Sequence, residues 1–219
     1  MTYLSNMTKL PDTIPIFPLT GILLLPNARL PLNIFETKYL EMIENVLGTQ
    51  SRIIGMIQAT SDENEDTLSQ NLSKVGCAGK VISFTETEDS RYLITLSGIS
   101  RFELLQPIDT ANSYLTAKVD WSLYKNDRKE EKTKANFKRE IFLDILSKYL
   151  KITNLQTDWD SLRKAEDELL INSLSMLCPF DQHEKQALLE ANTIKDRALI
   201  LQTLMEMTIK AEKSFGPLQ

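Results

Sequence analysis

The stretch Ile14–Leu40, IPIFPLTGILLLPNARLPLNIFETKYL, combines strand-forming apolar residues with prolines at positions 15, 18, 26 and 31. Proline lacks the N–H that a central strand donates and fixes φ at about −65°, so it marks strand edges, bulges and crossings. After Glu36 the apolar spacing becomes helical and stops at Gly48. The helical stripe consists of Tyr39, Leu40, Ile43, Val46 and Leu47. The stretch predicts short edge-type strands followed by one early amphipathic helix.

The remainder of the first half also predicts β structure. Apolar and β-branched runs bounded by turn residues predict strands at 14–17, 21–25, 29–34, 52–58, 75–87, 92–105 and 114–123. A turn at Thr87–Ser90 joins two of these runs as a hairpin, and Gly98 indicates a bulge that lets one long strand serve two sheet edges. Many short strands that fold back on themselves favour a small, partly closed barrel.

The second half has helical periodicity, and four helices are expected. Apolar stripes predict the first two, and the second of these ends before Pro179. The stripes are Phe137, Ile141, Ile145, Tyr149 and Ile152, then Ala165, Leu169, Ser173 and Leu177. Reciprocal capping pairs start the other two, Asp181 with Glu184 and Thr193 with Asp196. The sequence therefore predicts an α+β protein with a β subdomain at residues 1–124 and a four-helix subdomain at residues 125–219.

Composition indicates a folded chain in a reducing compartment. With 219 residues and 42% hydrophobic content, the chain can bury a conventional core. No apolar run reaches the roughly 18 residues of a membrane span, and the N-terminus lacks the layout of a signal peptide. Cys77 and Cys178 have no paired spacing, which fits buried thiols better than a disulfide framework. We expect a cytoplasmic protein without a membrane partner.

The net charge of −5 comes entirely from the first half. Residues 1–124 hold 9 Lys/Arg against 14 Asp/Glu, whereas residues 125–219 hold 16 of each. Binding to phosphates needs a basic surface that releases counterions. Nucleic acid is therefore not an expected partner, although the fold type predicted here includes RNA-binding modules.

The motifs that would carry chemistry are incomplete. His183 is the only histidine, and Ala187 stands where an H-E-x-x-H site needs its second zinc ligand. The acidic run Asp62–Asp66 lacks the glycine and the closing glutamate of a calcium loop. Gly76–Val81 has neither the glycine spacing nor the hydroxyl of a P-loop, and no G-x-S-x-G elbow is present. We expect no catalytic residue, no metal and no cofactor.

Several segments resemble the N-terminal substrate-binding domain of the Lon protease family. They are P-L-x-G-x-L-L-L-P at 18–26, R-L-P-L-N-I-F-E-x-x-Y-L at 29–40, the V-G strand at 75–82, G-x-x-R-F at 98–102, K-Q-x-L-L-E at 185–190 and x-R-x-x-x-L at 196–201. Together they extend over roughly residues 12 to 212. Thr37 and Lys38 replace the usual proline and arginine of the family, and lysine cannot reproduce a bidentate guanidinium contact.

The resemblance implies both a fold name and a function. The fold would be a PUA-like, partly closed β-barrel subdomain with one early helix, followed by the helical subdomain. Full-length Lon proteases carry their ATPase and Ser-Lys peptidase domains after this region, whereas this chain ends at Gln219. The expected function is a stand-alone, non-catalytic module that binds exposed apolar segments of unfolded or tagged proteins.

The candidate binding groove lies in the Pro-Leu segment. We expect Phe17, Leu19, Leu24, Phe35 and Tyr39 to belong to the core. The residues that flank turns are expected to be exposed, and their prolines would shape an apolar groove at little entropic cost. These candidate substrate-binding residues are Leu23, Leu25, Pro26, Leu30 and Pro31, together with Glu36. Glu36 precedes the N-terminus of a helix, and the helix dipole stabilises the negative charge of its carboxylate.

Two other function classes remain open at this point. The chain could be an adaptor that docks a folded protease or another protein through its helical half, or an enzyme with an unrecognised site. A small-molecule or RNA module is a third reading, which fold analogy allows. A large apolar patch on the helices would favour the adaptor, and a deep pocket with convergent titratable side chains would favour the enzyme.

Overall fold

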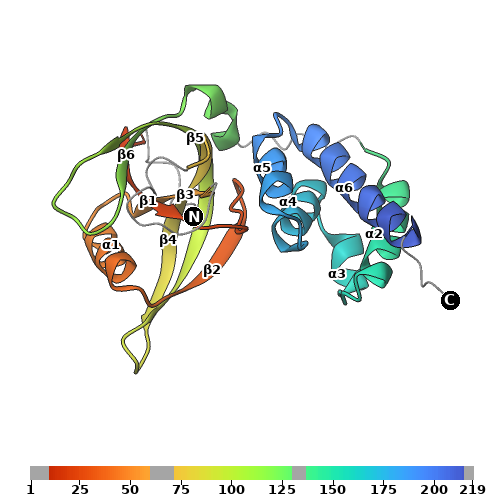
Figure 1. The fold of residues 1–219 in the computed structure, drawn as a ribbon, viewed down its shortest axis with the longest axis horizontal. Coiled ribbons are helices and arrows are strands. Elements are labelled where there is room, and N and C mark those ends of the chain that lie inside the picture. The colour runs from red at the N-terminus through yellow and green to blue at the C-terminus, as the bar shows by residue number, and fades with distance from the viewer. Residues whose placement is uncertain (1–9, 60–71, 130–136, 215–219) are drawn as a thin grey trace. The chain divides into compact units, whose positions relative to one another are not determined.

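A computed structural model describes residues 10–59, 72–129 and 137–214, with side chains as far as residue 212 (Figure 1). The chain divides into two compact units, residues 1–129 and residues 130–219, which we call the β unit and the helical unit. The boundary predicted after residue 124 lies within a short 3-10 helix, η2 (Ser122–Arg128), in the β unit.

The described part of the β unit contains six strands and one α-helix. They are β1 (Thr13–Pro18), β2 (Arg29–Ile34), α1 (Thr37–Leu47), β3 (Ile53–Ile57), β4 (Val75–Glu86), β5 (Tyr92–Ile108) and β6 (Thr116–Asp120). The early helix and six of the seven predicted strands are confirmed. The strand predicted at 21–25 is wrong, because this segment has irregular backbone that starts with Gly21 at a φ of 72°. Prolines 18 and 26 bracket the segment and interrupt any regular ladder.

The strands form one sheet that turns back on itself, which confirms the α+β class. The order is β2-β5-β4-β3-β1-β6, and β6 also pairs with β5, so the sheet is ring-like without full closure into a barrel. β5 has 17 residues: its first half lies between β2 and β4, and its second half pairs with β4 and β6. Opposite Ala78 and Gly79, β5 places Ser100 and Gly98, so Ile99 is an extra residue. The bulge predicted at Gly98 is therefore confirmed.

Gly98 also provides the crossing point for the Pro-Leu segment. A Cβ on Gly98 would lie 2.0 Å from the carbonyl oxygen of Leu25, so the two backbones are in direct contact. The Asn27 N–H donates to the Gly98 carbonyl at 3.0 Å, and the Gly98 N–H donates to the Ala28 carbonyl at 2.9 Å. The segment is thus fixed across β5 before it enters β2.

A buried ion pair joins η2 to β5. Asp127 accepts hydrogen bonds from the Arg101 side chain at 2.7 and 2.8 Å and from the Arg101 backbone N–H at 2.9 Å. The guanidinium carbon also lies 4.3 Å from the Tyr124 ring centroid. Burial lowers the pKa of Arg101, but the hydrogen bonds and charge of Asp127 raise it above its usual value. The β unit therefore includes η2.

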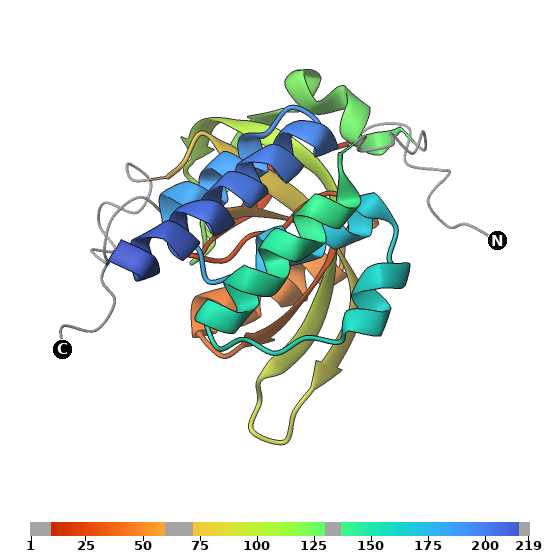
Figure 2. The same cartoon turned by 90° about the vertical axis from the view of Figure 1, so that its right-hand side faces the viewer.

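The described helical unit contains α2 (Arg139–Ile152), α3 (Trp159–Lys164), α4 (Asp167–Leu177), α5 (Gln182–Glu190) and α6 (Ile194–Ser214), seen from another side in Figure 2. Four of these match the predicted helices, and the six-residue α3 was missed. Asp181 and Glu184 form the predicted capping box, and Thr193 and Asp196 bond reciprocally at the start of α6. Asp158 accepts two backbone N–H bonds at the start of α3.

The predicted stripe of α4 is the wrong face of the helix. Leu169 and Leu177 are exposed, and the buried residues are Leu170, Ile171, Asn172, Leu174 and Ser175. The sequence of α4, DELLINSLSML, holds two overlapping apolar stripes, so spacing alone does not choose between them. Ile141 in α2 is likewise exposed, and Phe142 is buried in its place.

Candidate functional site

The structure buries half of the predicted groove. Leu23, Leu25 and Pro26 are buried, and Leu25 is 0% exposed, so their predicted exposure is wrong. The reason is local: in a strand alternate side chains would face outward, but this irregular segment turns Leu23, Leu24 and Leu25 inward together. These residues belong to the core beneath the crossing at Gly98.

The other predicted residues lie on β2 and just after it. Leu30 is half-buried, whereas Pro31 and Glu36 are exposed. Phe35, which was expected in the core, is 64% exposed. The available signal was the alternation along β2, in which Arg29, Pro31 and Asn33 face outward, so the next odd position continues the exposed series.

Lys38, in the first turn of α1, lines an open cavity of about 380 Å³, and Glu36 is the residue that precedes this helix. Glu36 makes no side-chain cap and pairs with Lys38 at 3.5 Å, and the Lys38 ammonium lies 5.1 Å from the Tyr39 ring centroid. The opposite wall is the segment 108–115, which is held to α1 by a bond from Asn45 to the Tyr114 hydroxyl at 3.1 Å. The cavity lining contains no histidine, cysteine or paired acids.

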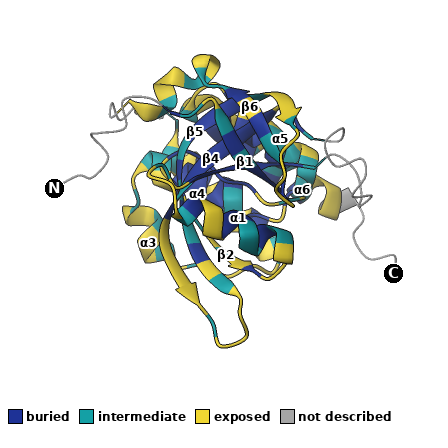
Figure 3. Ribbon diagram, turned by 90° about the vertical axis from the view of Figure 1, so that its left-hand side faces the viewer, coloured by how far each residue is buried: buried dark blue, intermediate teal, exposed yellow. Residues whose placement is uncertain are grey.

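Three exposed apolar side chains lie in the hairpin formed by the end of β4 and the start of β5, residues 82–93, which we call the hairpin arm. It is drawn as exposed in Figure 3, and the last five residues of β4 are all exposed. Ile82, Phe84 and Leu93 are 48%, 44% and 48% exposed. Asn33 of β2 lies directly opposite Leu93 in the register. Leu93 therefore lies beside Asn33 on one face of the sheet, whereas Phe84, which is paired with Ile94, lies on the other face of the arm.

Hydrogen bonds hold the hairpin arm in place. The Tyr92 hydroxyl donates to Glu44 of α1 at 3.0 Å, and this bond raises the pKa of Tyr92. The Phe84 and Tyr92 rings meet edge to face at 5.2 Å. At the turn, Thr87 donates to Asp89, which lowers the pKa of that carboxyl. The arm is therefore anchored by these contacts, and it exposes Ile82, Phe84 and Leu93 among polar side chains.

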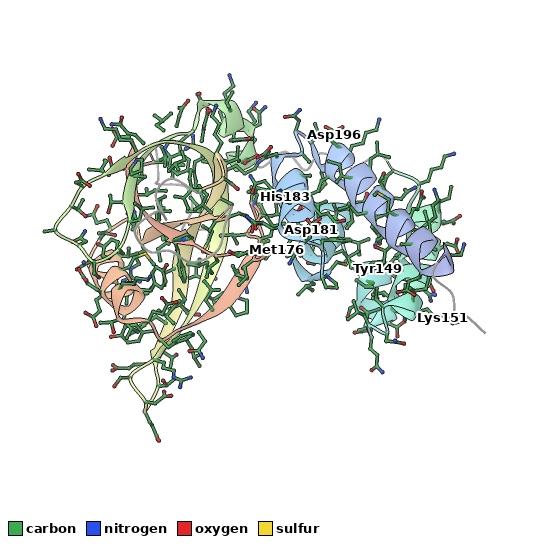
Figure 4. All side chains as sticks on the ribbon, viewed as in Figure 1. Tyr149, Lys151, Met176, Asp181, His183 and Asp196 are labelled. Atoms are coloured by element: carbon green, nitrogen blue, oxygen red, sulfur yellow. The ribbon has the colours of Figure 1, made fainter. Side chains whose placement is uncertain are left out.

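A second open cavity, of about 480 Å³, lies between α2 and α3 in the helical unit. It is lined by Glu140, Leu143, Asp144, Ser147, Trp159 and Arg163. His183 is exposed in the first turn of α5, as predicted (Figure 4). It lines neither cavity. Neither cavity is lined by a histidine or a cysteine, so neither offers an imidazole base or a thiol nucleophile.

The described residues contain no cluster of three His, Cys, Asp or Glu side chains that could hold a metal ion. The acidic run Asp62–Asp66 lies outside the described residues. Among the helices described, none is both long and apolar enough to span a bilayer.

Parallels in sequence are found in Lon proteases. Residues 13–207 match the family described as the ATP-dependent protease La (LON) substrate-binding domain. The Lon protease of Flavobacterium johnsoniae is 26% identical over 212 residues, 95% of this chain and 25% of that protein. The Lon protease of Parabacteroides distasonis is 28% identical over 201 residues, 90% of this chain and 24% of that protein. The chain thus spans about a quarter of the length of these relatives.

Two solved structures share the fold. A Lon N-terminal domain protein from Xanthomonas campestris has a TM-score of 0.58 at 20% identity and covers 89% of this chain and 97% of that one. The N-terminal domain of the Mycobacterium avium complex Lon protease has the same TM-score at 15% identity, with coverages of 89% and 98%. The family match extends over nearly the whole described chain, and the resemblance first seen at the Pro-Leu segment is confirmed: the chain belongs to the Lon substrate-binding domain family.

Proposed function

We propose that this chain is a non-catalytic protein-binding module that captures exposed apolar segments of unfolded or tagged proteins. The observation that carries the proposal is the hairpin arm, whose side chains Ile82, Phe84 and Leu93 stay exposed although the β unit has a well-buried core. Exposed apolar groups of this kind mark interaction surfaces. The family relation supports a protein ligand in general.

The proposed contact surface consists of the hairpin arm, with Phe84 on one face and Leu93 on the other, together with Pro31, Phe35 and half-buried Leu30. Glu36, with its partner Lys38, forms the polar rim. Leu23, Leu25 and Pro26 support this surface from the core. We assign residues to the contact surface or to the core by their burial, because a buried leucine cannot contact a client unless the structure around it unfolds.

The energetics predict weak and sequence-tolerant binding. Burying three large apolar side chains contributes roughly 1.5 to 3 kcal/mol each. Association costs at least about 4 kcal/mol, so a single site has a Kd weaker than about 0.1 mM. A receptor for many different unfolded chains requires this combination of low affinity and low selectivity.

The test compares charged substitutions on the hairpin arm with matched substitutions elsewhere. Phe84→Asp and Leu93→Asp should lower the affinity for a reduced, carboxymethylated client protein at least tenfold and leave the unfolding midpoint nearly unchanged. Leu105→Asp and Leu123→Asp are the controls, because both leucines are exposed in the same unit but outside the arm. Equal loss from all four variants, or from none, would remove the arm from the binding surface.

A second candidate function, docking of a folded protease or other protein through the helical unit, is favoured by exposed leucines. α4 exposes Leu169 and Leu177, and α6 exposes Leu199 and Met207. Leu177→Asp and Leu199→Asp should then abolish binding to a folded partner and leave client capture intact. For the enzyme alternative, the cavities offer no support, and purified protein should neither hydrolyse ATP nor cleave casein above a mock preparation.

A further inference from the structure

β2 is the one strand with a single partner in the described sheet. β1, β3, β4 and β6 each pair with two strands, and β5 pairs with three along its length, whereas β2 pairs with β5 alone. The ring-like pairing of β6 with both β1 and β5 removes the edge that would otherwise exist at the opposite end. The outer side of β2 is therefore the free edge of the described sheet.

The pairing register shows which backbone groups face this edge. The Gly98 N–H donates to the Ala28 carbonyl, so the Ala28 carbonyl points toward β5. In an antiparallel ladder this direction alternates, so Leu30, Leu32 and Ile34 also bond to β5. Arg29, Pro31 and Asn33 consequently direct their backbone groups away from the sheet, and all three are exposed.

Pro31 occupies the central outward position. Because a proline there removes no bond to β5, it is tolerated in the strand. It does remove one outward donor, so the edge offers N–H groups at Arg29 and Asn33 and carbonyls at Arg29, Pro31 and Asn33. An interrupted edge of this kind resists tight pairing with another strand.

We propose that the outer edge of β2 binds an extended client segment as an added strand, and that Pro31 limits the strength of this pairing. The occupant is an unfolded polypeptide, because the edge presents main-chain groups that any sequence can match. Side chains of the added strand would lie beside Pro31 and Asn33 of β2, with exposed Phe35 just after the end of that strand, and Leu93 lies one strand further in, opposite Asn33. The inference rests on the proposed function and specifies its mode of recognition.

N-methylated peptides test the backbone contact directly. The probes are three fluorescein-labelled decapeptides of one alternating valine–threonine sequence, titrated with the full chain by fluorescence anisotropy. The first peptide is unmethylated. The second is methylated on the backbone nitrogen of every second residue, so that all N–H groups along one edge of its strand remain. The third is methylated at consecutive residues, so that neither edge keeps its N–H groups. The first two should bind alike, and the third at least tenfold more weakly, since several hydrogen bonds are lost.

The outcomes separate this inference from the proposed function. Equal binding of all three peptides would overturn edge pairing and leave client capture in place. Absence of binding by all three, together with absence of denatured-client binding, would overturn the proposed function and the edge with it. Binding of denatured client but of no peptide would also overturn edge pairing, because main-chain recognition does not require one sequence.

Backbone substitutions in β2 give a second readout. Asn33→Pro removes an outward donor and should weaken the unmethylated peptide about threefold to tenfold relative to Asn33→Ala, which changes the same side chain but keeps the N–H. Pro31→Ala restores the missing donor and should tighten binding by a similar factor. Unchanged affinity in both Asn33→Pro and Pro31→Ala would overturn the proposal. Thermal unfolding of each variant confirms that β2 remains folded.

Discussion

The β unit and the helical unit hold their elements together by different means. In the β unit, four glycines lie where an added Cβ would come within 3.0 Å of a neighbouring side-chain or backbone atom. They are Gly55, Gly76, Gly79 and Gly98. The helical unit has no glycine from residue 137 to residue 214. Its short helices end instead at Ala165, Cys178 and Ala191, all with non-helical backbone.

Basic side chains cap the short helices in place of glycine. In each case a cation from a neighbouring helix donates to carbonyls of the last turn or the cap, and it also opposes the negative end of the helix dipole. The bonds are Arg139 to Leu162 and Ala165 at 2.9 and 2.7 Å, Lys185 to Met176 at 3.4 Å, and Arg197 to Leu188 at 2.8 Å. We therefore expect the β unit to lose most stability when a side chain is added at one of its glycines. The helical unit should lose most stability when one of these basic side chains is removed.

Each unit contains one tryptophan, which makes this comparison measurable in the full chain. Trp121 lies in the β unit and donates to the Pro11 carbonyl at 2.9 Å, and Trp159 lies at the start of α3. In a Trp159→Phe background the fluorescence reports the β unit, and in a Trp121→Phe background it reports the helical unit.

The largest effect is expected from Gly98→Ala. The added Cβ would overlap the Leu25 carbonyl, which is backbone and cannot rotate away, so the Pro-Leu segment must leave β5. We expect a loss of more than about 4 kcal/mol or failure of the β unit to fold. Gly48→Ala is the control, since Gly48 has φ −71° and the atom nearest to its added Cβ would be 3.4 Å away. Urea unfolding followed by Trp121 fluorescence should show that this control stays within about 1 kcal/mol of the wild type.

Breaking the buried ion pair should have the next largest effect. Arg101→Leu leaves the Asp127 carboxylate buried without its cation, and we expect a loss of about 3 to 5 kcal/mol in the β unit. The double variant Arg101→Leu/Asp127→Leu should recover part of this loss. Arg91→Leu, which breaks an exposed pair with Asp89 at 2.8 Å, should cost less than about 1 kcal/mol. A loss from Arg101→Leu no larger than that from Arg91→Leu would contradict the stabilising role of the pair.

Arg197→Met tests the capping of α5. The substitution leaves the Leu188 carbonyl and the Asn172 side-chain oxygen without this donor in the interior, so the expected loss is about 2 to 4 kcal/mol in the helical unit. Lys195→Met, at an exposed position of the same helix, should change stability by less than about 0.5 kcal/mol. The measurement is urea unfolding followed by Trp159, and Trp121 should report no change in the β unit.

The sequence predicted the fold better than the site, and the reason is visible in individual residues. Periodicity identifies an element, so β2, α1 and the capping box at Asp181 were correct. Burial depends on which face packs, and neither spacing nor composition distinguishes the face of α4 with Leu169 from the face with Leu170. The short α3 was missed because six residues are too few for a periodic signal.

The Pro-Leu segment shows the same limit at the candidate site. Its exposure was predicted from turn-flanking positions, but contact with Gly98 buries Leu25, and this contact joins residues 73 positions apart in the sequence. The exposed arm residue Phe84 lies in a strand whose pattern looks ordinary. Its exposure follows from the length by which β4 and β5 extend past the core, which no local pattern specifies.

The smallest expected effect is a pH dependence confined to the helical unit. Burial raises the pKa of the Cys178 thiol from its ordinary 9.0 to about 11, so the folded state keeps the thiol protonated at pH values where the unfolded chain ionises. The resulting stability is fully present below about pH 9 and is lost as the pH rises toward about 11, because deprotonation then favours the unfolded state. A tenfold change in the ionisation constant corresponds to about 1.4 kcal/mol, which gives a loss of at most about 2 to 3 kcal/mol.

Cys178→Ala separates this effect from general alkaline unfolding. The variant should be less stable than the wild type at about pH 8, since it lacks a buried side chain, and this difference should shrink by about pH 10.5, because alanine has no thiol to ionise. The measurement is urea unfolding followed by Trp159 at both pH values. A difference that stays constant between them would show that the thiol ionises equally in both states. Burial also raises the pKa of Tyr149, which is present in both proteins and interacts with Cys178. Tyr149→Phe, measured with and without Cys178→Ala, completes a double-mutant cycle that separates the contribution of this interaction from that of the thiol alone.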